Sequence, residues 1–219
     1  MKPVGILGGM GPEATILLMQ KVLAAIDAGD DADHVPLIVH QNPQVPSRIK
    51  ALIEGTGADP APTLRQMARD LESAGAQALA MPCNTAHHYA AAISASTDLP
   101  FINMIDLTAR ALTGKGRIGM LASPAVRKVG VFDMAFSGLG LEAVYPDDGP
   151  ILGIIQAVKA GDEPDIGAFQ TIAAQLLSET DYLCVACTEL SLLTDALPSD
   201  KWTDSLDCLT HGMVSFATG

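Results

Sequence analysis

The sequence predicts an α/β protein with two similar lobes, each a parallel sheet flanked by helices. Short apolar runs typical of buried strands alternate with helical patterns along all 219 residues. Two of these runs, at 78–81 and 182–186, end alike: a cysteine, small polar residues and a new helical pattern follow. The repeat indicates two half-sites, and we expect the active site in a cleft between the lobes.

The first half of the chain begins with a strand that runs into a glycine turn, Gly8-Gly9-Met10-Gly11. Pro12 and Glu13 suit the first turn of a helix, because proline needs no N–H partner there and a carboxylate complements the helix dipole. Apolar residues at helical spacing predict a later helix around residue 67, ended by Gly75. We therefore expect strands at 3–7, 35–39, 78–81 and 99–104, and helices at 14–28, 64–74 and 106–112.

The second half repeats this order. Gly114-Lys115-Gly116 breaks the pattern and is the predicted domain boundary, so the first lobe takes residues 1–113 and 206–219 and the second takes 114–205. Strands are expected at 117–121, 141–145 and 182–186, and helices at 124–137, 151–159 and 166–177. A last helix at 206–217 is expected to pack onto the first lobe.

Composition narrows the function classes. A net charge of −12 argues against nucleic acid or an anionic membrane as partner, although it leaves room for a small anionic ligand. The sequence shows neither an apolar run of transmembrane length nor a signal-peptide pattern. Four cysteines are too few for a disulfide scaffold of this length, and reduced thiols suit the cytoplasm. A cytoplasmic protein is expected.

Cys83 and Cys187 are the candidate catalytic residues. Ligands of open α/β sheets bind at the carboxyl ends of strands, where both cysteines are expected. The start of a following helix would favour the thiolate. Two thiols on opposite sides of one carbon can invert it, one removing the Cα proton and the other delivering a proton. Such a scheme requires neither a metal nor pyridoxal, so no cofactor and no metal site are predicted.

Two motifs invite other interpretations. The glycine turn departs from the dinucleotide-binding pattern at Ala14, so its glycines are expected either to bring backbone N–H groups to a carboxylate or to form a tight turn only. Cys184-x-x-Cys187 lacks the further ligands that zinc requires. Positions three apart on a strand face opposite sides, so Cys184 is expected in the core.

The remaining candidates would hold the substrate. Asn84, Thr85 and Thr188 can donate hydrogen bonds to an α-carboxylate while negative charge develops on Cα. Arg48 is either a solvated surface residue or a bidentate carboxylate ligand. Lys159 ends a helix, where a cation also complements the dipole.

Five motifs together resemble the aspartate/glutamate racemases, a family of cofactor-independent enzymes with two catalytic cysteines. They are Gly5-Ile6-Leu7-Gly8-Gly9-Met10-Gly11-Pro12, Asn42-Pro43-Gln44-Val45-Pro46-Ser47-Arg48, Met81-Pro82-Cys83-Asn84-Thr85-Ala86-His87, Val158-Lys159-Ala160-Gly161 and Cys187-Thr188-Glu189-Leu190. The resemblance implies two pseudo-symmetric α/β domains, an active site between them and a homodimer. It makes Cys83 and Cys187 the two bases, and Arg48 and Lys159 the ligands of the substrate's side-chain carboxylate. Met10 and Ser123 complete the candidate substrate-binding set.

Two departures from the family pattern leave the substrate open. Ser123-Pro124-Ala125-Val126 stands where aspartate racemases commonly have a Thr-Gly-Thr-like turn, and Phe132 stands where a tyrosine is frequent. The expected activity is racemisation of aspartate, glutamate or a related acidic amino acid. Three alternatives remain: a cysteine-dependent decarboxylase or cis–trans isomerase of a dicarboxylate, a non-catalytic sensor of an acidic ligand, and, least favoured, a dithiol redox protein.

Overall fold

The computed structural model of the protein describes residues 1–198 and 200–219. Two compact units divide the chain: Met1–Met104 with Leu206–Gly219, and Ile105–Ser205. The sequence places the boundary at residues 114–116, whereas the structure groups helix α4 (Met104–Ala111), from Ile105 onward, with the second unit. The reason is packing, because Ile105, Ala109 and Leu112 belong to a buried cluster of that unit.

The first unit contains a four-stranded parallel sheet with the order β2-β1-β3-β4. Its strands are β1 (Val4–Gly8), β2 (Leu37–Gln41), β3 (Ala78–Ala80) and β4 (Phe101–Ile102). Ile6 of β1 lies opposite Val39 on one side and Ala80 on the other, so the carboxyl ends of β1 and β3 meet at one edge.

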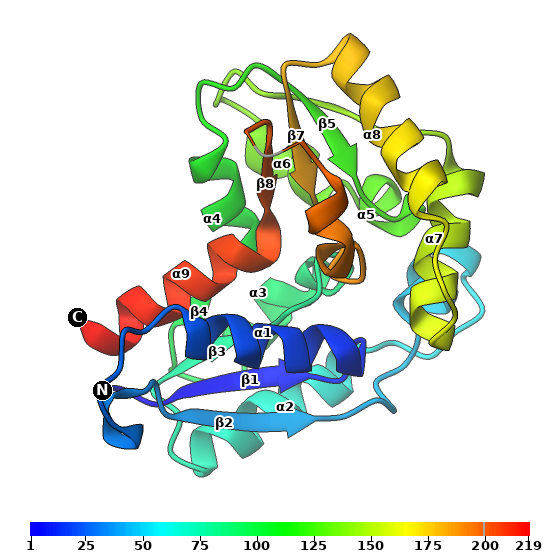
Figure 1. Ribbon diagram of the computed structural model, residues 1–219. Coiled ribbons are helices and arrows are strands. Elements are labelled where there is room, and N and C mark those ends of the chain that lie inside the picture. The colour runs from blue at the N-terminus through cyan, green and yellow to red at the C-terminus, as the bar shows by residue number, and fades with distance from the viewer. Residues whose placement is uncertain (199) are drawn as a thin grey trace. The chain divides into compact units, whose positions relative to one another are not determined.

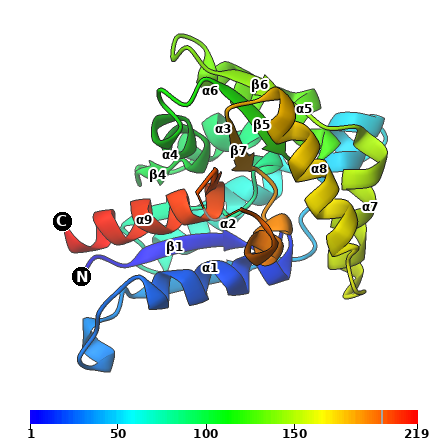
Figure 2. The same cartoon turned by 45° about the horizontal axis from the view of Figure 1, so that its top comes forward.

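Helices cover both faces of this sheet. Helices α1 (Pro12–Ala24) and α9 (Ser205–Thr218) pack on one face, where Val4, Ile6 and Leu18 share a buried cluster with Leu206 and Leu209. Both views of the ribbon show α1 and α9 beside β1 (Figures 1 and 2). Helices α2 (Ala61–Ser73) and α3 (Ala90–Ser94) cover the other face.

The second unit repeats this plan with the strand order β6-β5-β7-β8, again all parallel. Its strands are β5 (Arg117–Leu121), β6 (Glu142–Val144), β7 (Tyr182–Val185) and β8 (Trp202–Asp204). Helices α7 (Asp148–Ala160) and α8 (Ile166–Glu179) pack on the face of Leu183 and Val185. Helices α4, α5 (Pro124–Val129) and α6 (Val131–Phe136) pack on the face of Cys184.

The predicted fold class is confirmed: two parallel sheets, each flanked by helices. Several bounds differ. The first helix ends at Ala24, and the helix expected over 124–137 is divided at Gly130, whose φ of +65° ends α5. The segments after the two cysteines are 3₁₀ turns, Thr85–Tyr89 and Leu190–Ala196, rather than the starts of long helices.

Each sheet has a topological switch point, where successive connections turn to opposite sides. In the first sheet it lies between β1 and β3, and in the second between β5 and β7. Ligands of open α/β sheets bind at such points, outside the carboxyl ends of the strands. Within the part of the chain that the structure describes, no helix is long and apolar enough to cross a membrane.

Candidate functional site

Cys83 lies at the switch point of the first sheet, three residues after β3. Its side chain is 7% exposed and belongs to a buried cluster that includes Met10, Val45 and Tyr89. Met10 follows β1, and Val45 follows β2. Three strand ends of one sheet therefore bring their loops together around this thiol.

His87 holds the backbone of the Cys83 turn. Its Nδ1 lies 2.8 Å from the Cys83 carbonyl oxygen, and the Met104 N–H donates to its Nε2 at 3.2 Å. Burial lowers the pKa of His87 to about 4, so the ring is neutral at physiological pH. Because Nε2 accepts, the ring proton resides on Nδ1 and is donated to Cys83.

The glycine turn after β1 serves the fold. The Gly9 N–H donates to Thr15 Oγ1 at 2.9 Å, so the partner of this amide lies within the protein. Gly9 has φ +92°, and a Cβ there would lie 2.4 Å from the Asn42 carbonyl carbon. Met10 is 2% exposed. Glycine is required here because the loops after β1 and β2 approach so closely.

Arg48 lies half-buried on the loop after β2. Its Nη1 donates to the carbonyl oxygens of Val45 at 3.3 Å and Pro46 at 3.1 Å. Across residues 1–198 and 200–219, no acidic side chain forms an ion pair with it. Its charge contributes to the electrostatics of Tyr89, whose pKa is raised by burial and by Asp59 and lowered by Arg48. The guanidinium thus keeps donors for an external carboxylate.

Cys187 lies at the switch point of the second sheet, two residues after β7, and is 7% exposed. Its Sγ–H donates to Glu189 Oε2 at 3.1 Å. The other carboxylate oxygen of Glu189 forms an ion pair with Lys159 Nζ at 3.0 Å. Glu189 is only 5% exposed, and Lys159 lies in the last turn of α7. Two motifs far apart in the sequence thereby form one thiol–carboxylate–ammonium network.

The surroundings of Cys187 favour its protonated form. Burial raises the pKa of its thiol well above the usual value, the Glu189 charge and hydrogen bond raise it further, and Lys159 opposes them. The direction of this shift is opposite to the one that a helix dipole would give. Only a seven-residue 3₁₀ segment follows Cys187, so the long helix expected after this cysteine is absent there.

Three of the other candidates come just after a cysteine in the sequence, and they differ in exposure. Asn84 and Thr188 are each 2% exposed, and Thr85 is partly buried. Ser123 follows β5, which pairs with β7, and its Oγ accepts a hydrogen bond from the Val126 N–H at 3.4 Å as the N-cap of α5. Phe132 is fully buried in the cluster of Cys184.

Cys184 lies in the core of the second unit, as expected. It is fully buried, in a different cluster from Cys187. No group of three or more His, Cys, Asp or Glu side chains is arranged to hold a metal ion among the residues that the structure describes.

Glu189 and His87 were not among the predicted site residues, and His87 was expected only to pack or to cap a helix. Both stand inside quoted motifs, Cys187-Thr188-Glu189 and Cys83-Asn84-Thr85-Ala86-His87. The available signal was their residue type, because a carboxylate or imidazole a few positions from a catalytic thiol is a candidate for controlling it. Their partners, Lys159 and Met104, come from other elements and could not be read from local spacing.

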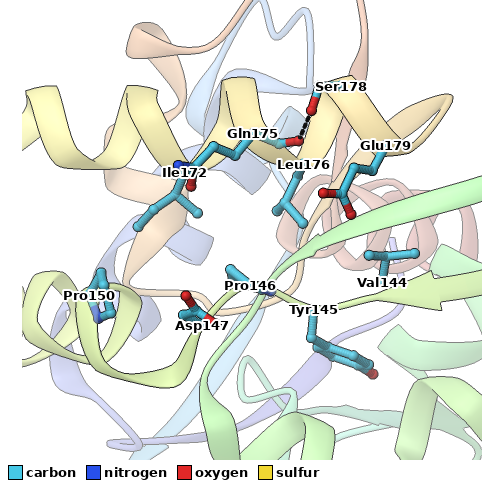
Figure 3. A pocket seen from close by; sticks show the side chains of 10 residues that line it. All are labelled: Val144, Tyr145, Pro146, Asp147, Pro150, Ile172, Gln175, Leu176, Ser178 and Glu179. Carbon is cyan, nitrogen blue, oxygen red and sulfur yellow. Dashed lines mark hydrogen bonds between the residues drawn. The ribbon is translucent and has the colours of Figure 1, made fainter.

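A separate pocket of about 400 Å³ lies in the second unit, where the segment after β6 faces α8 (Figure 3). Asp147 and Glu179 line it, together with Tyr145 and Gln175. Neither cysteine nor any other predicted site residue lines this pocket.

Comparisons with known proteins identify the family. The model of the Asp/Glu/hydantoin racemase family matches residues 7–210. A broad specificity amino-acid racemase of Bacillus subtilis (strain 168) is 25% identical over 97% of this chain and 96% of its own. The aspartate racemase of Picrophilus torridus has a TM-score of 0.90 and 30% identity, covering 100% of this chain and 95% of that one. An aspartate racemase homologue from Pyrococcus horikoshii OT3 shares the fold, with a TM-score of 0.76 and 21% identity over the whole of both chains. The chain belongs to the Asp/Glu/hydantoin racemase family.

Proposed function

We propose that this enzyme racemises aspartate, glutamate or a related acidic amino acid without a cofactor, by proton transfer at Cα between Cys83 and Cys187. One observation carries the proposal. In two sheets of the same strand order, a cysteine stands just beyond the equivalent strand, β3 or β7, at the switch point. The relatives named as an aspartate racemase and a broad specificity amino-acid racemase support the reaction class.

The chemistry is a two-base exchange. One thiolate takes the Cα proton, so a C–H bond breaks, an S–H bond forms and the electron pair stays on Cα. The thiol on the opposite face then gives up its proton to Cα and becomes the thiolate. Atoms and electrons balance, and the enzyme is left ready for the reverse direction. General acid–base catalysis of this kind contributes about 10²–10⁴-fold to the rate.

In one direction of the reaction, this scheme makes Cys187 the acid and Cys83 the base. The raised pKa of the Cys187 thiol makes it the proton donor in the resting enzyme. Cys83 then acts as the base that receives the substrate proton. Glu189 maintains this asymmetry because its carboxylate accepts the Cys187 proton as a hydrogen bond and repels a thiolate.

Arg48 is the proposed ligand of the side-chain carboxylate. Its guanidinium donates to two backbone carbonyls, and none of the acidic residues in the described ranges forms an ion pair with it. Lys159 is already 3.0 Å from the Glu189 carboxylate, so we propose that it acts on the substrate mainly through the electrostatics of Cys187. Met10, Asn84, Thr85, Ser123 and Thr188 are proposed to shape the pocket and hold the α-carboxylate.

Deuterium exchange tests the reaction. Wild-type enzyme is incubated in D₂O with single enantiomers of aspartate, glutamate and two neutral amino acids. We expect deuterium at Cα of the acidic substrates, together with inversion. Cys83→Ser and Cys187→Ser should each lower the racemisation rate by at least about 10³-fold, because both proton transfers need a thiol. Racemisation that survives in either variant would exclude the two-base scheme.

A parallel arm of the experiment tests the substrate class. Arg48→Ala should raise KM for acidic substrates more than for neutral ones, because it removes a carboxylate ligand. Equal effects on both classes would remove this role. Release of CO₂ or isomerisation of a dicarboxylate without Cα exchange would favour the alternative enzymes, and binding without turnover would favour the sensor.

We also propose that the enzyme is a cytoplasmic homodimer. The apolar face of α1 supports the dimer, since Ile16, Met19 and Leu23 are 51%, 39% and 56% exposed. They line a groove of about 370 Å³ with Val35 and Leu37. Exposed apolar patches of this kind mark contact surfaces. The net charge of −12 supports the expectation that neither nucleic acid nor an anionic membrane is a partner.

A further inference from the structure

His87 is a buried polar side chain for which the racemase chemistry proposed above has no step. It is 6% exposed and its ring lies 5.5 Å from that of Phe101, so little water reaches it. Both of its ring nitrogens nevertheless have partners, Cys83 O and Met104 N. Burying an imidazole costs free energy unless its polar atoms are satisfied, and this one is satisfied by two backbone groups from different parts of the first unit.

The hydrogen bond from His87 is the second of two that hold the backbone of Cys83 in place. On the N-terminal side, the Cys83 N–H donates to the Met81 carbonyl oxygen at 2.9 Å. On the C-terminal side, the Cys83 carbonyl accepts from His87 Nδ1–H at 2.8 Å. Both peptide groups of Cys83 are thus fixed, which sets the direction of its Cα–Cβ bond. Only rotation about χ1 remains to aim the sulfur.

The second hydrogen bond links this turn to a distant part of the chain. Met104 begins α4 and is the last residue of the first unit before the chain enters the second. Its N–H is a helix N-terminal donor, which helices must satisfy from outside. His87 Nε2 accepts it at 3.2 Å. The His87 side chain is therefore hydrogen-bonded both to the turn that carries Cys83 and to Met104, where the chain leaves the first unit.

We propose that His87 is a positioning residue that aims the Cys83 thiol by donating Nδ1–H to the Cys83 carbonyl, while Nε2 anchors the turn to Met104. The role rests on the proposed function, in which the Cys83 sulfur must approach Cα within a narrow range of directions. Misaiming a reacting group by about 1 Å costs on the order of 10²-fold in rate.

Two substitutions separate the two hydrogen bonds. His87→Asn places an amide nitrogen where Nδ1 lies, so it can keep the bond to Cys83 and lose the one to Met104. His87→Gln extends an amide to the position of Nε2, so its oxygen can accept from Met104 while the bond to Cys83 is lost. Both replacements are uncharged amides of similar polarity, which makes them matched controls for each other.

The readouts are melting temperature, kcat, KM and the alkylation rate of Cys83 by iodoacetamide, followed by mass spectrometry of the Cys83 peptide. We expect His87→Asn to keep kcat within about threefold of wild type, and His87→Gln to lower kcat by about tenfold or more with KM nearly unchanged. Cys83 alkylation should change in the Gln variant and stay near wild type in the Asn variant. A purely structural role would lower kcat in both variants in step with melting temperature, and would overturn the proposal.

Nitrogen NMR of the wild-type protein tests the proposed role of His87 even if neither variant folds. The ¹⁵N shifts of His87 should report a neutral ring protonated at Nδ1, and alkylation of Cys83 should move them. A ring protonated at Nε2 would overturn the proposal. Neither the NMR nor the alkylation needs turnover. An enzyme that racemises no amino acid would therefore refute the proposed function and leave the test of His87 intact.

Discussion

At the scale of single residues, Glu189 and Lys159 act on Cys187 with opposite signs. The carboxylate accepts the thiol proton as a hydrogen bond and raises the pKa of Cys187, whereas the ammonium lowers it. Glu189→Gln should therefore move the pH profile of Cys187 alkylation to lower pH, and Lys159→Met should move it to higher pH. Both substitutions should lower racemisation kcat, on the order of tenfold, because each moves the pKa of the Cys187 thiol away from its wild-type value and so disturbs proton transfer. Peptide mapping after timed iodoacetamide labelling from pH 6 to 11, a range chosen about the usual thiol pKa, measures the shifts. Profiles that move in the same direction would contradict the assigned network.

The same residues show which features of the candidate site could be predicted from the sequence alone. Cys83 and Cys187 were predicted to follow matching strands, and both do so in the structure. The ion pair between Lys159 and Glu189 could not be predicted, because it joins α7 to the turn after β7 and depends on tertiary packing. The raised pKa of Cys187 could not be predicted for the same reason. A helix dipole can be inferred from local sequence, but a buried carboxylate 3.1 Å from a thiol cannot.

At the scale of elements, the loops after β1 and β2 touch at Gly9. The Asn42 N–H donates to the Gly8 carbonyl oxygen at 3.2 Å, and Asn42 backbone atoms fill the space where a Gly9 Cβ would stand. Gly9→Ala adds this clash to a positive φ, which alone costs about 1–3 kcal/mol. We expect a loss of unfolding free energy above that range and a loss of activity, because the second loop carries Arg48. Urea unfolding and racemisation assays measure both.

Gly75→Ala is the matched control for Gly9→Ala. Gly75 has a similar φ, +98°, but a Cβ there would meet nothing within 4 Å. It should therefore show the conformational cost alone, about 1–3 kcal/mol, with activity retained. Equal destabilisation by the two substitutions would mean that the contact with Asn42 contributes nothing.

Element types were easier to predict from the sequence than element ends. Buried apolar runs and helical spacing located most strands and helices, because strands such as β1 and β7 are buried on both faces and apolar. Strand β8 (Trp202–Asp204) was not predicted, because its short sequence contains two polar residues. The 3₁₀ turns after the cysteines escaped prediction, since an alanine-rich sequence such as 86–92 suits an α-helix equally well. The π-helical turn at Lys50–Glu54 had no local signal either.

At the scale of the whole molecule, the repeated strand order is the feature on which the function depends. Order 2-1-3-4 in the first sheet corresponds to 6-5-7-8 in the second, so β3 and β7 are equivalent and both precede a cysteine. Alternating strands and helices made this plan predictable, because crossover connections force parallel pairing. The boundary between the two units was harder to predict from the sequence. Gly114 and Gly116 mark a break in the pattern, but the packing of α4 decides the grouping.

The apolar face of α1 leads to the last prediction, which concerns assembly. Dimers with two-fold symmetry use one self-complementary patch on both subunits. Here protruding side chains, Ile16 and Leu23, lie beside the groove that could receive their copies. Light scattering during size-exclusion chromatography should give twice 22.7 kDa for the wild type, and 22.7 kDa for Leu23→Lys, since a buried unpaired charge is costly. Met134→Lys is the control, because Met134 is 67% exposed on α6 and does not line this groove, so the substitution should leave the dimer intact. A wild-type monomer would refute the dimer. A dimer that survives Leu23→Lys and is broken by Met134→Lys would place the contact elsewhere on the molecule.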